Sequence, residues 1–566
     1  MDKIRVLLIT LIIAVSFYGV IQFGAFKQEH DKAALVMQHQ EAEISAADDD
    51  TPSIISSTND TPQLIAKKQP QDGNDHSIEI DTDIFNIKID KKGGDITYIA
   101  LKKYAATLET PDIPFVLMQE NSQYHYEGMS GLIGPNGTDK SQGRPLFSSE
   151  KNKFTLNTGQ DKLIVDLKLQ QGEVNITKRF IFSRDEYLFK VNYIIDNQSD
   201  RPWEGAVYAQ IKRDSYKPVA ETSGMGMSPY LGFALRTNED RFKKIDFSDL
   251  KEGDFKTELT GGWIAMIQHY FLTAWIFNAE KETKFKLFKS QHSDLNIAQG
   301  IQGNSVIAPK QKGELNLEFY AGPKDQYQLA KISEGLDLSV DYGFLWWIAQ
   351  PLYALLYFFN NGVLHVYDHK FDVFSGFNNW GIAIILLTLL IKLIFYSLNV
   401  KAYTSMARMR AIQPKMLAIK DRYANDRQKL SQETMALYKK EGVNPIGGCL
   451  PMLVQMPFFI ALYWVLMESV ELRHAPFFGW IHDLSAMDPY FILPLLMGIS
   501  MFFQQRMQPA PPDPMQAKVM QFLPVIFTFF FLFFPAGLVL YWVVNNIVTI
   551  LQQWYITKKI EEKSKA

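Results

Sequence analysis

Residues 380–398 read WGIAIILLTLLIKLIFYSL, an apolar stretch in which the one charged residue is Lys392. At 1.5 Å per residue, a helix of this length covers about 28 Å, close to the hydrocarbon thickness of about 30 Å in a bilayer. The stretch therefore predicts a membrane-spanning helix. Further apolar stretches predict four more spans, at Leu450–Leu466, Tyr490–Phe503, Val519–Phe534 and Leu538–Tyr555.

The last two of these spans are separated only by Pro535-Ala536-Gly537. One continuous helix over Val519–Tyr555 would measure roughly 55 Å, which is too long for a bilayer. We therefore expect the chain to fold back at Pro535-Ala536-Gly537.

The loop after the first of these spans sets the orientation of the bundle. Residues 401–444 contain ten Lys or Arg residues and four acids, and basic loops of this kind stay in the cytoplasm. If the preceding apolar stretch, Phe344–Phe359, also crossed the membrane, this basic loop would be exported. Because Phe344–Phe359 contains Trp346, Trp347 and a proline, we predict that it lies in the membrane interface instead.

The N-terminus has its own apolar run, Val6 to Phe23, which follows Lys3 and Arg5. A cleaved signal peptide and an uncleaved membrane anchor share this pattern. No small-x-small cleavage site follows the run, because Gly24-Ala25-Phe26 leads directly into a lysine. We therefore favour an uncleaved anchor, after which the chain is exported.

From residue 78 the pattern changes to short runs with a period of two. Ile78 and Ile80 alternate with acids, and Gly93-Gly94 marks the first of many turns. Many short strands separated by turn residues predict a large antiparallel β-sandwich. The single cysteine of the chain excludes an intramolecular disulfide and any cysteine-built metal site.

These patterns predict a multi-domain protein, in which an α-helical membrane bundle of six spans, five of them in a C-terminal core, is joined to a large periplasmic antiparallel β-sandwich. Both termini then lie in the cytoplasm. The predicted segments are a signal-anchor helix (1–26), a disordered periplasmic tether (27–77), the β domain (78–340), an interfacial amphipathic helix (341–362), the five-helix core (377–557) with a cytoplasmic helical hairpin (400–443), and a basic cytoplasmic tail (558–566).

Polar residues recur at helical spacing inside the predicted spans. Those of the first span are Thr388, Lys392, Tyr396 and Asn399, and those of the last are Tyr541, Asn545, Thr549 and Gln552 or Gln553. Steps of three and four place each set on one helix face. Gln455 adds a polar group in the next span. Interhelical hydrogen bonds, each worth about 0.6 kcal/mol, would account for single residues of this kind. Two polar stripes, one of which contains the cation Lys392, are harder to explain in this way. They favour a water-filled cavity open to the cytoplasm.

The predicted cytoplasmic hairpin owes part of its apolar surface to methionines, namely Met406, Met409, Met416 and Met435. They either pack the two helices together or form an adaptable surface that accepts varied apolar partners. The ten basic residues suit topology control and lipid headgroups. They could also contact ribosomal RNA phosphates, but no aromatic residues are interleaved with them to contact bases.

Motifs for catalysis are missing from the sequence: it has no P-loop, no G-x-S-x-G and no H-E-x-x-H. His365 and His369 are four residues apart beside Asp368, but no third ligand is apparent. We therefore expect a protein that is not an enzyme and that uses no metal or cofactor.

The C-terminal half resembles the YidC family of membrane-protein insertases. The motifs that carry the resemblance are NPIGGCLP (444–451), QMP (455–457), SVELR (469–473), WIHDLS (480–485), DPM (513–515) and PAGLVLYW (535–542). The anchor, tether and β domain resemble the Gram-negative form of the family, whose exported domain is a β-supersandwich similar to sugar mutarotases.

The resemblance implies a membrane protein insertase and chaperone of the bacterial inner membrane. Its clients would enter a hydrophilic groove open to the cytoplasm and the lipid, and would leave beside the third and fifth spans. The implied groove residues are Lys392, Thr388, Tyr396, Gln455, Tyr541, Trp542, Asn545 and Thr549, with the four methionines receiving the client. The implied partners are nascent membrane proteins, the Sec translocon, the ribosome, the signal recognition particle pathway and the bilayer, but no specific nucleic-acid sequence.

Two positions depart from the family pattern. Lys392 stands where the family generally has arginine, and Trp542 stands where it has the second tyrosine of a pair. Lysine lacks the planar fork with which arginine binds a carboxylate through two hydrogen bonds.

The polar stripes also fit a second class of protein, a small-solute or proton transporter, although the sequence shows no repeated halves. A third class is an anchored carbohydrate-binding or carbohydrate-modifying domain.

Overall fold

The computed structural model describes residues 76–121, 124–140, 143–217, 229–291, 293–366, 369–423, 426–443, 450–508 and 514–565. The predicted anchor (1–26) and nearly all of the predicted tether (27–77) lie outside these residues. The described chain forms two compact units. We call residues 76–217 and 230–339 the β unit, and residues 340–565 the helical unit.

The β unit contains two large sheets. Adjacent strands pair antiparallel except β1 and β6, which pair in parallel. The first sheet has ten strands in the order β13 (Phe255–Thr260), β16 (Glu282–Lys289), β17 (Leu295–Ile307), β10 (Trp203–Asp214), β5 (Tyr124–Ile133), β4 (Pro114–Asn121), β3 (Asp95–Ala105), β2 (Phe85–Asp90), β1 (Ser77–Asp81) and β6 (Lys153–Thr155).

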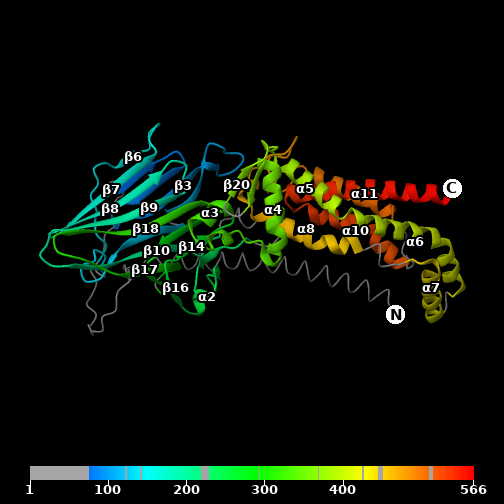
Figure 1. Ribbon diagram of the computed structural model, residues 1–566, viewed down its shortest axis with the longest axis horizontal. Helices are drawn as coiled ribbons and strands as arrows, with labels where there is room; N and C mark the ends of the chain where they lie inside the picture. The colour runs from blue at the N-terminus through cyan, green and yellow to red at the C-terminus, as the bar shows by residue number, and fades with distance from the viewer. Residues whose placement is uncertain are drawn as a thin grey trace. The chain divides into compact units, whose positions relative to one another are not determined.

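The second sheet has eight strands, of which β7, β8, β9 and β18 run side by side in Figure 1. Its order is β12 (Lys243–Ile245), β11 (Gly232–Leu235), β14 (Trp263–Ile267), β15 (Phe271–Phe277), β18 (Gln311–Pro323), β9 (Leu188–Asn197), β8 (Val174–Ser183) and β7 (Lys162–Gln171). Two short helices, α2 (Asp249–Glu252) and α3 (Gln326–Ile332), and the 3₁₀ turn η2 (Leu336–Ser339) complete the unit.

The two sheets pack face to face, because side chains from one reach the other. The Tyr126 hydroxyl on β5 lies 2.6 Å from the Thr273 hydroxyl on β15, and the Trp275 indole donates to the carbonyl of Gln210 on β10 at 2.9 Å. The period-two pattern places alternate residues between the sheets. This confirms the predicted antiparallel sandwich. Residues 153–169 form two strands rather than one run, with the break at residues 156–161.

The helical unit begins with η3 (Gly343–Leu345) and α4 (Trp346–Asn361), a two-stranded hairpin of β19 (Val363–Val366) and β20 (His369–Asp372), and then the remaining helices. The helices are α5 (Trp380–Ile394), α6 (Tyr396–Arg422), α7 (Arg427–Glu441), α8 (Leu450–Glu468), the 3₁₀ turn η5 (Val470–Leu472), α9 (Ile492–Arg506), α10 (Pro514–Phe531) and α11 (Ala536–Lys565). Each of the five predicted C-terminal spans thus overlaps a helix, and α11 begins at the predicted break.

Two helices differ from the sequence-based expectation. The predicted first span ends early, at Ile394, and α6 starts at Tyr396 after a bend of 67°. The residues around this bend include no proline or glycine, so the sequence contains no signal for it. At the other end, α11 continues to Lys565, so the described part of the basic tail extends the last helix rather than forming a separate segment.

Length and composition identify few of these helices as spans by themselves. Among the described residues, Ala536–Ile560 of α11 is the single straight helix long and apolar enough, and α5 with α6 qualifies only as a bent pair. Leu453–Glu468 and Ala517–Phe531 are apolar but shorter. The number of spans therefore stays a prediction.

Candidate functional site

The centre of the candidate site is the ammonium of Lys392, two residues before the end of α5. The Lys392 side chain is buried, and its Nζ donates to the hydroxyl of Thr549 on α11 at 2.8 Å and to the side-chain oxygen of Gln455 on α8 at 3.3 Å. Both acceptors are neutral. Among the described residues, no carboxylate forms an ion pair with Lys392. The structure thus brings three of the predicted site residues together around one unpaired charge.

The Thr549 hydroxyl has two roles in this arrangement. It donates to the backbone carbonyl of Asn545, one turn earlier in α11, at 2.7 Å, and it accepts from Lys392. Its proton is therefore committed to the helix, which leaves its lone pairs for the ammonium. The predicted residue Asn545 supports the site through this carbonyl, and its own side chain is half-buried.

A second polar contact lies farther along the same helices. The Asn399 side chain of α6 donates to the side-chain oxygen of Gln552 on α11 at 3.3 Å, and Asn399 is fully buried. The other side-chain atom of this amide, Oδ1, has no hydrogen-bond partner among the described residues. A buried acceptor without a partner is unfavourable unless water or another polar group reaches it.

Thr388 keeps the position that the spacing predicted, but Tyr396 does not. Thr388 is buried one turn before Lys392, where its hydroxyl donates to the carbonyl of Ile384 at 2.7 Å. Tyr396 is 43% exposed. The prediction that Tyr396 shares the Lys392 face is wrong, because the helix breaks between them and the step of four residues no longer returns to the same side.

Tyr541 and Trp542 lie at the start of α11, next to an aromatic group. Tyr541 is buried and stacks on Phe459 of α8, with ring centroids 6.2 Å apart. Trp542 meets the edge of Phe459 at 4.5 Å and Phe531 of α10 at 5.1 Å. The indole N–H of Trp542 is buried and lacks a hydrogen-bond acceptor among the described residues. The indole N–H of Trp542 is therefore a second buried polar group, after Asn399 Oδ1, that water or a client backbone could satisfy.

The four methionines of the hairpin do not form one surface. Met416 is buried between α6 and α7, where the Tyr438 hydroxyl lies 3.0 Å from its sulfur. Met406 lies 3.9 Å from the side-chain nitrogen of Gln553 on α11, and Met409 is half-buried. Met435 alone of the four is strongly exposed. Packing within the hairpin therefore explains Met416, and a client-receiving surface stays a prediction for Met406, Met409 and Met435.

The sequence patterns missed the polar contact between α9 and α11. The side chain of Asn546 donates to the Ser500 hydroxyl at 3.0 Å, and both residues are buried. Gln553, two turns later on α11, donates to the carbonyl of Met507 at 3.0 Å. The spacing of seven residues between Asn546 and Gln553 is a helical signal, and it would have identified this second face.

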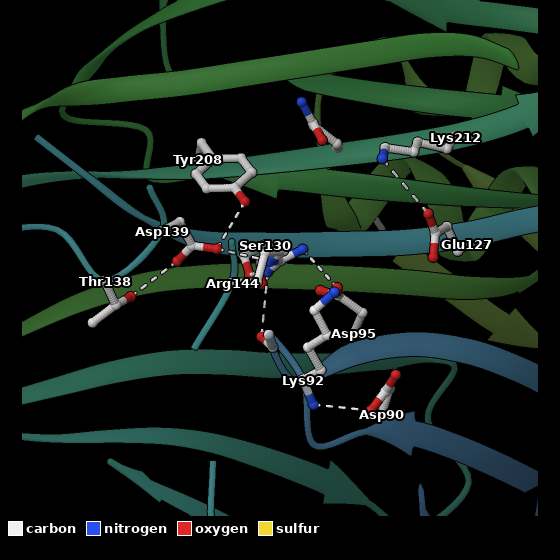
Figure 2. Close-up of polar contacts among 12 residues, drawn as sticks. Asp90, Lys92, Asp95, Glu127, Ser130, Thr138, Asp139, Arg144, Tyr208 and Lys212 are labelled. Carbon is white, nitrogen blue, oxygen red and sulfur yellow. Dashed lines mark hydrogen bonds and ion pairs between the residues drawn. The ribbon is translucent and has the colours of Figure 1, made fainter. Parts of the chain in front are cut away.

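A separate buried charge cluster lies in the β unit. Figure 2 shows the guanidinium of Arg144 next to the carboxylates of Asp95 and Asp139, at 2.6 and 2.8 Å. Tyr208 and Thr138 donate to Asp139 at 3.0 and 2.9 Å. The cluster joins the start of β3 to the connection after β5, and we call it the Arg144 cluster.

A lysine from the opposite sheet completes the cluster. Lys178 on β8 is buried, and its Nζ donates to the backbone carbonyls of Gly93 and Ser130 at 3.0 and 3.1 Å. Arg144 donates to the Ser130 carbonyl as well, at 2.7 Å. Two basic and two acidic side chains therefore share one largely buried site, and their arrangement serves packing of the sandwich rather than an evident reaction.

Burial shifts the protonation of two members of this cluster toward neutral forms. Desolvation raises the pKa of Asp95 to about 7, against the opposite pull of Arg144 and Lys178. Desolvation lowers the pKa of Lys178 to about 7, against the pull of Asp95. In the folded protein, Asp95 and Lys178 therefore change between their charged and neutral forms near neutral pH, rather than near their ordinary pKa values.

We expect the stability of the β unit to pass through a minimum near pH 7. Between about pH 4 and 7 the folded state holds more protons on Asp95 than the unfolded chain, so stability falls as the pH rises. Between about pH 7 and 10 the unfolded chain holds more protons on Lys178, so stability rises. The slope of each limb is at most about 1.4 kcal/mol per pH unit.

Hydrogen exchange of β5 amides in the full-length protein, corrected for the intrinsic effect of pH on exchange, measures this profile. Asp95→Asn should flatten the acidic limb, and Lys178→Met the alkaline one. A profile that both substitutions leave unchanged would contradict the assignment.

The fold and site define a class of protein: an apolar helical unit that buries a lysine held by neutral side chains, in a chain that also forms a large β-sandwich. Comparison with family models gives the particular family. The model described as "YidC periplasmic domain" matches residues 77–355, and the model described as "60Kd inner membrane protein" matches residues 372–563.

Full-length relatives agree with these matches. A protein of Cellvibrio japonicus described as "Membrane protein insertase YidC" is 49% identical over 99% of this chain and 99% of its own. A protein of Stutzerimonas stutzeri with the same description is 46% identical over 100% of both chains. The chain therefore belongs to the YidC family of membrane protein insertases, as its motifs indicated, and is not an enzyme.

A solved structure titled "Active YidC insertase crystal structure with the first transmembrane domain resolved" aligns with 85% of this chain and 93% of its own. The identity is 17% and the TM-score is 0.39.

Proposed function

We propose that this chain inserts proteins into the bacterial inner membrane, and helps them fold and assemble, by offering polar partners inside the bilayer. No covalent step is needed. The observation that carries the proposal is the buried ammonium of Lys392, which is held by the neutral side chains of Thr549 and Gln455. A cation without a local counter-charge can attract a carboxylate that arrives with a client.

The proposed topology has six spans. These are the N-terminal anchor and the helices α5, α8, α9, α10 and α11, with both termini in the cytoplasm. Residues 401–444, with ten basic residues against four acids, support a cytoplasmic position for α6 and α7. The β unit then lies in the periplasm, as a β-supersandwich of the kind expected for the Gram-negative form of the family.

The proposed groove begins at Asn399, near the cytoplasmic end, and reaches Trp542. Unsatisfied polar atoms mark both positions, at Asn399 Oδ1 and at the Trp542 indole N–H. Water or a client's backbone would satisfy them. Polar groups of this kind are tolerated at membrane depth where they line a wet cavity. A client's polar segment would thus cross part of the bilayer in contact with hydrogen-bonding groups, while its apolar segment enters the lipid beside α8 and α10.

The energies involved are modest. On insertion scales, one charged side chain at the centre of a membrane helix costs about 2.5–3.5 kcal/mol. A lysine and a carboxylate 4 Å apart attract each other by about 4 kcal/mol at an effective dielectric constant near 20, before desolvation. One ion pair in the groove is therefore comparable to the barrier for one client charge, and no external energy source is required.

The proposed partners are nascent membrane proteins, delivered by ribosomes and the signal recognition particle pathway, either directly or together with the Sec translocon. The exposed basic face of α6 and α7 suits ribosomal RNA phosphates or lipid headgroups.

Site-specific crosslinking to a stalled nascent chain tests the proposal. We expect a photoreactive residue at Lys392, at Leu453 of α8 or at Phe527 of α10 to crosslink the client. Leu393 provides the matched control, because it is adjacent to Lys392 on α5 but points outward and is 70% exposed. Equal crosslinking at Leu393 and Lys392, or none at Lys392, would argue against a client path through the bundle.

A further inference from the structure

The segment between α4 and α5 was not predicted to be regular, and it forms a small β-hairpin. β19 and β20 pair antiparallel, with Leu364 opposite Phe371 and Val363 opposite Asp372. Because neighbouring residues of a strand point to opposite faces, Leu364 and Phe371 share one face, and Val363 and Asp372 share the other. Val363 is buried. The face with Leu364 and Phe371 is turned away from that buried side.

The hairpin and the loop after it are fixed to the end of α4. The amide of Val373 donates to the carbonyl of Gly362 at 2.9 Å, and the amide of Phe377 donates to the carbonyl of Phe359 at 3.1 Å. The chain passes so close to α4 that a Cβ on Gly362 would collide with the carbonyl oxygen of Phe374. Gly362 also has a φ of 70°, a conformation that favours glycine. The segment is therefore held in place rather than hanging free.

The outer side of this fixed segment is apolar. Its exposed side chains are Leu364, Phe371, Val373, Phe374 and Phe377, with exposed fractions of 38–58%. An apolar patch of this extent on a rigid surface indicates an apolar partner.

The position of the hairpin in the helical unit identifies the partner. α5 begins at Trp380, soon after the hairpin, and its other end leads into the basic helices α6 and α7. Figure 1 likewise shows α4 and β20 at the end of the helical unit opposite α6 and α7. With α6 and α7 in the cytoplasm, the hairpin lies at the periplasmic end of α5. The surroundings there are the headgroups and upper acyl chains of the outer leaflet, where aromatic side chains concentrate.

We propose that the β19–β20 hairpin and the loop 373–377 insert into the outer-leaflet interface of the bilayer, as a lipid-binding wedge next to α4. The inference rests on the orientation given under the proposed function. Phe371 and Val373 contact acyl chains, while Lys370, which lies 3.6 Å from Asp372, stays with the headgroups. Backbone bonds between the wedge and α4 set the depth of both, and therefore the depth at which α5 enters the membrane.

Spin labels in the full-length protein test this inference. Cys449→Ser removes the one native cysteine, and single cysteines then carry a nitroxide at Phe371 or Val373. The protein is reconstituted in vesicles of phosphatidylethanolamine and phosphatidylglycerol, and its insertion of a client is measured in the same vesicles. Collisions of each label with oxygen, which enters lipid, and with a water-soluble nickel complex report its depth.

Two reference sites calibrate the measurement. Phe522 of α10, 63% exposed, marks lipid, and Lys284 of β16, in the β unit, marks water. We expect the labels at 371 and 373 to lose nickel collisions relative to Lys284 and to keep oxygen collisions, as at Phe522. Nickel access equal to that at Lys284 would overturn the wedge. So would immobilised labels that neither reagent reaches, since these would indicate a protein partner or a second copy. An aqueous label at Phe522 would overturn the proposed function together with the wedge.

Discussion

Reversing the charge of Lys392 by Lys392→Glu is expected to lower the insertion of clients with acidic polar segments by about 10- to 100-fold. The ammonium lies in the bundle with only neutral partners, so its replacement by a carboxylate converts attraction of a client acid into repulsion. The full attraction is about 4 kcal/mol at 4 Å, and desolvation offsets part of it. A change of 1.4 kcal/mol corresponds to tenfold. Insertion into proteoliposomes, measured by protection of the translocated segment from protease, gives the ratio.

Three controls separate electrostatics from structural damage. Lys392→Arg keeps the charge and should insert the same clients as the native protein. Lys392→Gln removes the charge, and its insertion of the acidic client should lie between that of the Glu and Arg variants. A client whose polar segment is neutral should be inserted to nearly the same extent by all the variants, because the cation does not attract it. Equal insertion of the acidic client by the Glu and Arg variants would remove the electrostatic part of the proposal and leave only hydrogen bonding.

The sequence predicts the helices of the membrane unit well because their causes are local. Hydropathy over about 20 residues defines an apolar helix, and a run of lysines and arginines marks the cytoplasmic side. The fold-back at Pro535-Ala536-Gly537 follows from helix length alone, and α11 does begin at Ala536. The contact of Lys392 with Thr549 and Gln455 could also be predicted from the sequence, since polar residues in apolar helices form hydrogen bonds with each other.

Other parts of the site depend on geometry that no local pattern contains. The bend after Ile394 has no proline or glycine to announce it, and it removes Tyr396 from the Lys392 face. The contact of Asn546 with Ser500 requires the packing of α9 against α11, which depends on all the side chains between them.

The Arg144 cluster is the clearest case in the β unit. The alternation of β8 places Lys178 on the core face with Ile176 and Phe180, where a lysine is unexpected. Its neighbours come from positions far away in the chain, since Asp95 and Arg144 are 49 residues apart. Strand order in a sheet of this size is likewise a property of long-range pairing, so the sequence could predict a sandwich but not which charges it would enclose.

Removal of the central cation by Arg144→Met is expected to destabilise the β unit by about 3–5 kcal/mol. The substitution keeps most of the side chain's volume but leaves the carboxylates of Asp95 and Asp139 buried without the guanidinium between them. Breaking a buried ion pair costs more than the pair contributes, because each carboxylate left behind must either stay charged without hydration or take up a proton. For a unit of this size the loss corresponds to a fall of about 10 °C in the melting temperature, measured calorimetrically on the detergent-solubilised protein.

Arg179→Met is the matched control. Arg179 holds Asp166 through two hydrogen bonds of 2.7 Å, so its geometry is as good as that of Arg144, but the two side chains are 35% and 26% exposed. Solvent weakens such a pair, and its loss should cost no more than about 1 kcal/mol. The combination of Arg144→Met with Asp95→Asn and Asp139→Asn should recover part of the loss, since no unpaired carboxylate is then left inside. If Arg144→Met and Arg179→Met lowered the melting temperature by the same amount, burial would not explain the cost of breaking the Arg144 cluster.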